Sequence, residues 1–220
     1  MIRTALIAVL LNAVCLTVAL LIGASYDIKP SALYRDPAAV VEAKFAIGWF
    51  SNLGAVLMFA TATVCLFAAC ILRWTEPLPA FGVLTLMLAT DDLFMIHDGV
   101  FPFVGLPGTI LYGLYAGGAV VWIARFPDEI LRTRWPIFVT ALAFLGMSAV
   151  ADVVVDHVGL HGEVAYLVED TSKLMGIVFW TSYGLSFAWS AVNRHIDART
   201  VAVAGRNVAQ GRDIRTLEAA

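Results

Sequence analysis

The sequence predicts an all-α integral membrane protein built as a bundle of six transmembrane helices. Of its 220 residues, 60% are hydrophobic and only 14% are charged, against roughly 45–50% and about 25% in soluble domains. The mean hydropathy is +0.84. A soluble fold could not bury so much apolar surface, which excludes disordered proteins, coiled coils, nucleic-acid binders and cytosolic globular enzymes. Six continuous apolar stretches each approach the roughly 20 residues that a helix needs to cross a bilayer.

Turn and charge signals separate the six predicted spans. Proline residues and the Gly- and Pro-rich segment 102–108 interrupt the chain between them. The first apolar run is longer than the core of a secretory signal, so we expect a retained helix. Residues 1–193 then form one transmembrane domain, and residues 194–220 form a cytoplasmic tail. The predicted spans are approximately 4–24, 46–72, 80–96, 109–126, 136–155 and 164–190.

The Lys and Arg residues lie mainly on one side of this six-span arrangement. Ten fall on the side of the N-terminus, three fall on the opposite side, and Lys173 lies within the last span. Cytoplasmic loops carry the excess of Lys and Arg, so both termini are predicted to be cytoplasmic, in a multi-pass protein of the plasma or inner membrane. The ten are Arg3, Arg73, Arg125, Arg132, Arg134, Arg194, Arg199, Arg206, Arg212 and Arg215, and the three are Lys29, Arg35 and Lys44.

Ionisable residues gather in the outer halves of the third, fifth and sixth spans and in the adjoining loops. One charged residue at the centre of a transmembrane helix costs about 2.5–3.5 kcal/mol, so several are expected to face one another or a wet cavity. At a rise of about 1.5 Å per residue, Lys173 reaches the depth of Asp91 and Asp92. Glu169 and Asp170 are one helical turn from Lys173, so pairing within the sixth span is the alternative.

A short pattern occurs twice, with an offset of 60 residues, in the third and fifth spans. Both helices run from the inside to the outside, so the pattern predicts a duplicated hairpin, spans three and four with spans five and six. The functional groups of such repeats usually lie at the interface between them. Coincidence is the alternative, because Met, Ala and Gly are common in membrane helices. The equivalent residues are Met87 and Met147, Ala89 and Ala149, Asp92 and Asp152, and His97 and His157.

The histidines beside these carboxylates have the chemical make-up of a zinc site. Imidazole nitrogens and carboxylate oxygens suit Zn²⁺, and three ligands plus a water would supply an activated hydroxide. Gly159 and Gly162 indicate a turn in this segment, so loop histidines without a metal are the alternative. The candidate ligands are His97, Asp156, His157 and His161.

These residue types favour a membrane-embedded, zinc-dependent hydrolase that acts on a lipid-like substrate from the outer face. A proton- or cation-coupled transporter or channel is an alternative, although the inner halves of the spans are too apolar for a continuous polar path. A structural subunit with buried ion pairs is another. The expected partners are the bilayer and the lipid-like substrate, with no nucleic acid, and the sequence leaves the oligomeric state open. The candidate acid, base and orienting groups are Asp92, Asp152, Glu169, Asp170 and Lys173.

Other conspicuous residues of the spans are predicted to serve packing. Aromatic side chains such as Tyr112 and Trp180 are expected in the helix contacts or at the membrane interfaces. Gly117, Gly146 and Gly184 are expected to allow close approach of neighbouring helices.

Overall fold

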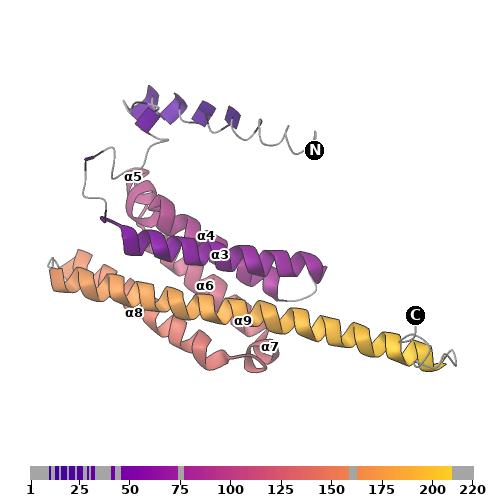
Figure 1. Ribbon diagram of the computed structural model, residues 1–220. Coiled ribbons are helices and arrows are strands. Elements are labelled where there is room, and N and C mark those ends of the chain that lie inside the picture. The colour runs from indigo at the N-terminus through magenta and orange to yellow at the C-terminus, as the bar shows by residue number, and fades with distance from the viewer. Residues whose placement is uncertain are drawn as a thin grey trace. The chain divides into compact units, whose positions relative to one another are not determined.

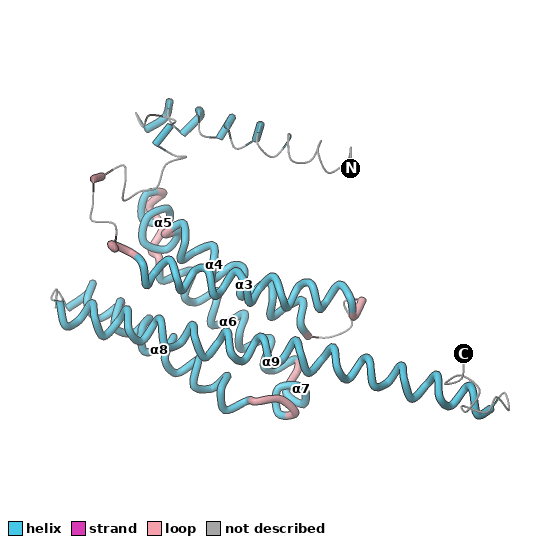
Figure 2. Tube along the Cα trace, viewed as in Figure 1, coloured by secondary structure: helices cyan, strands magenta, loops and turns pink. Residues whose placement is uncertain are grey.

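The described part of the chain is helical throughout, as the computed structural model shows. It covers residues 46–73, 77–158 and 163–209, together with short pieces between residues 10 and 42. The side chains of residues 155–158, 163 and 206–209 are not among those described. Within these residues, helices are joined by turns and short loops, and no strand occurs (Figure 2). The predicted all-α class is therefore confirmed.

The chain divides into two compact units, Met1–Trp49 and Phe50–Ala220. In the first unit, the described residues between 10 and 26 are helical and mostly exposed. The predicted span 4–24 lies largely outside the described residues. The second unit contains the helices that position the candidate site (Figure 1).

Helices of the second unit overlap five of the predicted spans, but by length and composition only two or three membrane spans are found among the described residues, so the six-helix bundle is not confirmed. Trp49–Ile71 and Trp135–Val154 are long and apolar enough to cross a membrane, and two helices that meet at a sharp bend would form a third span together. These helices support a membrane protein. In chain order the elements are α3 (Trp49–Ile71), α4 (Leu78–Phe94), η2 (Ile96–Val100), α5 (Phe101–Phe103), α6 (Thr109–Arg125), α7 (Pro127–Leu131), α8 (Trp135–Val158) and α9 (Glu163–Ala209).

The bend lies directly after α4, at Met95. The backbone of Met95 is left-handed, with φ 49° and ψ 46°, and the helix that follows turns away by 58°. Asp91 holds both sides of this break, because its carbonyl accepts the Met95 N–H and its Oδ1 accepts the His97 N–H at 2.8 Å. The α-helix of the predicted span 80–96 therefore ends at Phe94.

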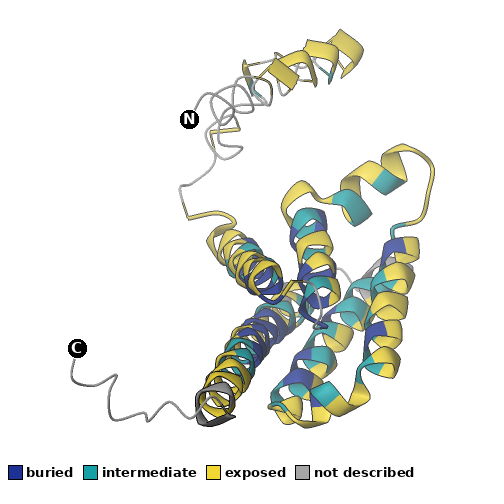
Figure 3. Ribbon diagram, turned by 90° about the vertical axis from the view of Figure 1, so that its right-hand side faces the viewer, coloured by how far each residue is buried: buried dark blue, intermediate teal, exposed yellow. Residues whose placement is uncertain are grey.

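An aromatic core joins α4, α6, α8 and α9. Phe81 is completely buried and stacks on Trp180, with 4.8 Å between the ring centroids. The indole N–H of Trp180 donates to Thr85 Oγ1 at 3.0 Å, and that of Trp122 donates to the Pro77 carbonyl at 3.0 Å. Both indoles are thus buried with their polar atom satisfied. Figure 3 shows that buried residues lie on the sides of the helices that face one another.

Two helices of the core, α8 and α9, pack closely over much of their length. A Cβ atom added to Gly176 of α9 would lie 2.9 Å from the backbone nitrogen of Leu145 on α8. Small residues at such positions let two helix backbones approach each other. Beyond this contact, α9 continues without a break past Asn193 to Ala209.

Candidate functional site

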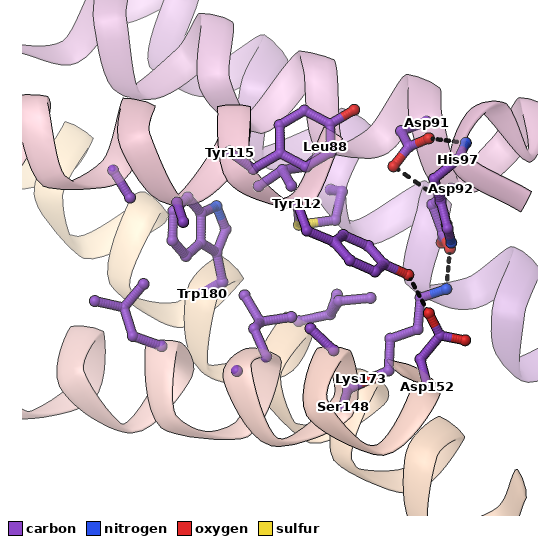
Figure 4. A pocket seen from close by; sticks show the side chains of 18 of the residues that line it. Leu88, Asp91, Asp92, His97, Tyr112, Tyr115, Ser148, Asp152, Lys173 and Trp180 are labelled. Carbon is purple, nitrogen blue, oxygen red and sulfur yellow. Dashed lines mark hydrogen bonds and ion pairs between the residues drawn. The ribbon is translucent and has the colours of Figure 1, made fainter. Parts of the chain in front are cut away.

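A cavity of about 280 Å³ lies between α4, α6, α8 and α9. Asp91, Asp92, His97, Asp152 and Lys173 lie together at one end of it, and Trp180 lies towards the other end (Figure 4). Leu84, Leu88 and Leu142 are among the apolar residues of the wall. The polar end is lined by Asp92, His97, Tyr112, Asp152, Glu169 and Lys173.

An ion pair connects α9 with α4 at the polar end. The Nζ atom of Lys173 contacts Oδ1 of Asp92, and the two side chains keep 32% and 12% of their accessible surface. Equal depth in the predicted spans had placed Lys173 opposite Asp91 or Asp92, and the structure pairs it with Asp92. The pair neutralises two charges that would be costly to bury separately.

A hydrogen bond connects α6 with α8 beside that ion pair. The hydroxyl of Tyr112 donates to Oδ2 of Asp152 at 2.6 Å. Tyr112 was predicted to serve packing, but it instead reaches across the cavity to a carboxylate (Figure 4). The sequence offered one usable signal, because Tyr112 lies near the predicted outer end of its span, at the level of the predicted site.

Two carboxylates hold the imidazole of His97. Its Nδ1 lies 2.9 Å from Oδ2 of Asp91, and its Nε2 lies 3.1 Å from Oδ2 of Asp98. Both ring nitrogens can donate hydrogen bonds only when the imidazole is protonated. This arrangement therefore favours an imidazolium at the break between α4 and η2. The ring of Tyr112 also lies beside it, with 5.1 Å between the ring centroids.

The remaining predicted site residues line the cavity, lie outside it, or have side chains that are not described. Glu169 is half-buried and lines the cavity, whereas Asp170 is exposed and does not. Asp156 and His157 lie on α8, but their side chains are outside the described residues, as is the whole of His161.

The predicted zinc site is not tested by the structure, because three of its four predicted ligands have side chains outside the described residues. Among the described residues, no group of three or more His, Cys, Asp or Glu side chains is placed to hold a metal ion. His97, the one predicted ligand with a described side chain, is bound to Asp91 and Asp98 instead.

Two contacts cross the cavity, and the residues of one lie about 60 positions from the corresponding residues of the other in the sequence. Asp92 on α4 is held by Lys173 on α9, and Asp152 on α8 is held by Tyr112 on α6. The two aspartates are 60 residues apart, and their partners are 61 residues apart. Each predicted hairpin thus supplies one aspartate and the partner of the other hairpin's aspartate.

These features define an all-helical membrane protein with ion-paired and hydrogen-bonded carboxylates around a cavity between its helices. The chain belongs to the family described as Domain of unknown function (DUF8692), and the family model matches residues 5–187. No curated protein and no solved structure matches the chain.

Proposed function

We propose that this protein is a membrane-embedded hydrolase that acts on a lipid-like amphiphile. One observation carries the proposal: a single cavity extends from the carboxylates and the amine to the apolar side chains near Trp180. Its volume of about 280 Å³ lies just below the usual range of about 300–1,000 Å³ for small-molecule sites. Such a cavity would accept the reacting group and part of one acyl chain, with the rest of the chain outside.

Asp152 is the proposed general base. Its Oδ2 is fixed by the Tyr112 hydroxyl at 2.6 Å, so the carboxylate is oriented at the wall of the cavity. A carboxylate held in this way can take the proton of a water that attacks an ester or amide carbonyl. His97 is not assigned this role, because carboxylates lie against both of its ring nitrogens.

Lys173 is the proposed donor to the oxyanion that forms during the attack. Its ammonium group carries a positive charge to the polar end of the cavity, where Asp92 orients it. A cationic donor held in place before the reaction stabilises the negative charge that develops on the oxyanion. Glu169, on the same face of α9 one turn earlier, completes the charged wall.

In the membrane, we propose the six-span arrangement with both termini in the cytoplasm and a duplicated hairpin. Five helices lie at the predicted spans, and the excess of Lys and Arg on one side supports the orientation. The two cross-cavity contacts support the duplication, because each aspartate is bound by a residue of the other hairpin. The site would then lie at the interface of the two repeats.

The geometry favours hydrolysis over proton or cation transport. A relay needs polar groups along a whole path, whereas the wall of this cavity away from the charges consists of side chains such as Leu84, Leu142 and Trp180. The proposed roles of Asp152 and Lys173 involve only described residues. A zinc ion held by Asp156, His157 and His161 stays a prediction, and treatment with a chelator tests it.

The test is hydrolysis of p-nitrophenyl esters of increasing acyl-chain length by the purified protein in lipid nanodiscs. We expect Asp152→Asn to lower kcat/KM by about 10²–10⁴-fold, the usual contribution of a general base. Asp128→Asn changes an exposed carboxylate on α7 and should leave the rate unchanged. Equal rates for the native protein and Asp152→Asn, or no turnover at any chain length, would overturn the proposal. Loss of activity with a chelator, restored by Zn²⁺, would assign the step to a metal.

A further inference from the structure

Lys173 lies where the charged end of the cavity meets its apolar wall. Its amine contacts Asp92, while Ile177 and Trp180 follow on the same helix and line the apolar part. These three residues of α9 are spaced four and three residues apart, so they share one helical face. The amine thus has a carboxylate as its partner and an apolar space next to it.

The cavity next to the amine is larger than the voids that close packing leaves in a protein interior. Protein interiors contain few voids larger than a water molecule, whose share of liquid volume is about 30 Å³. The cavity measures about 280 Å³, and small residues such as Ala116, Ala119, Gly146 and Ala149 form part of its wall. An ion pair that only connects two helices needs no open volume beside it. The cavity is therefore suited to receive an apolar molecule next to the amine.

We propose that Lys173 binds an aldehyde-bearing apolar molecule covalently, as a Schiff base whose counter-ion is Asp92. The body of this molecule would occupy the apolar part of the cavity. Lysine amines in apolar pockets are the usual nucleophiles towards carbonyl groups, and carboxylates inside membranes serve as counter-ions of such ligands. The inference goes beyond the proposed hydrolysis, because it concerns a covalent bond to the Lys173 amine and requires no turnover.

Asp92 is placed to move the protons of this reaction. It accepts one proton from the Lys173 ammonium, and the neutral amine then attacks the aldehyde carbon to form the carbon–nitrogen bond. A proton moves from nitrogen to oxygen in the resulting carbinolamine. Protonated Asp92 returns its proton to the hydroxyl, the carbon–oxygen bond breaks, and water leaves. Ammonium and aldehyde thus become iminium and water, and the net charge at Asp92 and Lys173 does not change.

The test is reductive trapping in phosphatidylcholine nanodiscs, with decanal as the long-chain probe and sodium cyanoborohydride as the reductant. The chain has two other lysines, Lys29 and Lys44, which serve as internal references. Peptide mass spectrometry should find the decyl adduct on Lys173 in about tenfold excess over either reference, a preference of about 1.4 kcal/mol. Acetaldehyde has almost no apolar body, so we expect the preference to shrink. Adducts spread evenly over the three lysines with both probes, or absent from Lys173, would overturn the proposal.

Two variants separate the amine from the cavity. Lys173→Arg keeps a cation opposite Asp92 but cannot form an imine, so the adduct should disappear. Ala149→Leu keeps Lys173 and narrows the cavity, so the yield with decanal should fall while that with acetaldehyde should not. Unchanged decanal labelling of Ala149→Leu would show that the chain lies elsewhere.

Trapping is also measured on Asp152→Asn, which we expect to lose hydrolysis but to retain the Lys173 adduct. Hydrolysis that depends on Asp152 without any adduct would overturn this inference alone. An adduct without hydrolysis would overturn the proposed function alone.

Discussion

Gly184 lies where α9 meets α3 and α4 most closely. A Cβ atom added there would lie 2.5 Å from Cγ2 of Thr61 and 2.9 Å from Cε1 of Phe81. Phe81 is fully buried in the aromatic core and has little room to move. We therefore expect Gly184→Ala to lower the free energy of unfolding by about 1–3 kcal/mol, as overpacking of a core does. Thermal unfolding of the purified protein in one detergent measures the change.

Gly117 of α6 provides the matched control. It is also a helical glycine, but no atom lies within 4 Å of the position that its Cβ would take. Gly117→Ala should be neutral or should raise the unfolding temperature, because alanine favours the helix by roughly 0.5–1 kcal/mol. Equal destabilisation by the two substitutions would show that the effect does not come from the contact with Thr61 and Phe81.

The sequence alone could not show which of these glycines lies in a close contact between helices. All were predicted to permit close helix contact, yet Gly117 and Gly146 have open space at the Cβ position while Gly184 does not. A glycine in a span signals that close approach is allowed, but the contact depends on which face meets a neighbour. The same limit explains Tyr112, because its residue type does not tell whether its hydroxyl meets lipid headgroups or Asp152.

The ion pair between Lys173 and Asp92 links α9 to α4 across the cavity. Replacing Lys173 by Met leaves the half-buried Asp92 without its cation, which should cost at most about 3 kcal/mol of stability, the lower end for a broken buried pair, because Lys173 keeps 32% of its side-chain surface exposed. Neutralising Asp92 as well removes that charge. We expect the double variant Lys173→Met with Asp92→Asn to regain most of the stability lost in Lys173→Met. Unfolding curves of the native protein, both single variants and the double variant form the required cycle.

A double variant as unstable as Lys173→Met would show that the two residues do not stabilise each other. The cycle also tests the purely structural alternative. If the stable double variant retained full hydrolysis, Lys173 would not be the oxyanion donor, and the pair would serve hydrolysis only by connecting the two helices.

At the level of the elements, the positions of the helices were predicted well from the sequence, whereas the break between α4 and η2 was not predicted. The starts of α4 and α7 are marked by prolines in their first turns, where the missing N–H costs nothing. The end of α4 at Met95 has no such signal, because methionine rarely adopts the left-handed conformation. Contacts made by Asp91, four residues earlier, hold this break, and such a contact cannot be derived from apolar periodicity.

For the whole molecule, the predicted depths brought the right charges together but did not show the cavity. Lys173 and Asp92 were expected at one level because helix rise converts residue number to depth. The apolar part of the cavity depends on the relative rotation of four helices, which residue number does not give. Residues that follow the last predicted span are helical as well, because α9 continues from the site to Ala209.

The topology of the whole chain depends on whether α6 crosses the membrane. It has 17 residues, a length of about 26 Å, which is slightly less than the roughly 30 Å of the hydrocarbon core. Crossing would place the loop at Leu106 outside and α7 inside, next to arginines that favour the cytoplasm. We therefore expect Leu106→Cys, in a variant without the three native cysteines, to react with a membrane-impermeant maleimide in intact cells.

The same reagent should reach Asp128→Cys only after the membrane is made permeable. Leu106 and Asp128 are both exposed on the protein, so burial does not explain a difference between them. Labelling of both sites from outside would place the two ends of α6 on one side, and the six-span arrangement would then be wrong. Labelling of Leu106→Cys from outside and of Asp128→Cys only after permeabilisation would show that α6 crosses the membrane despite its short length. It would also identify the side from which an amphiphile reaches Asp152 and Lys173.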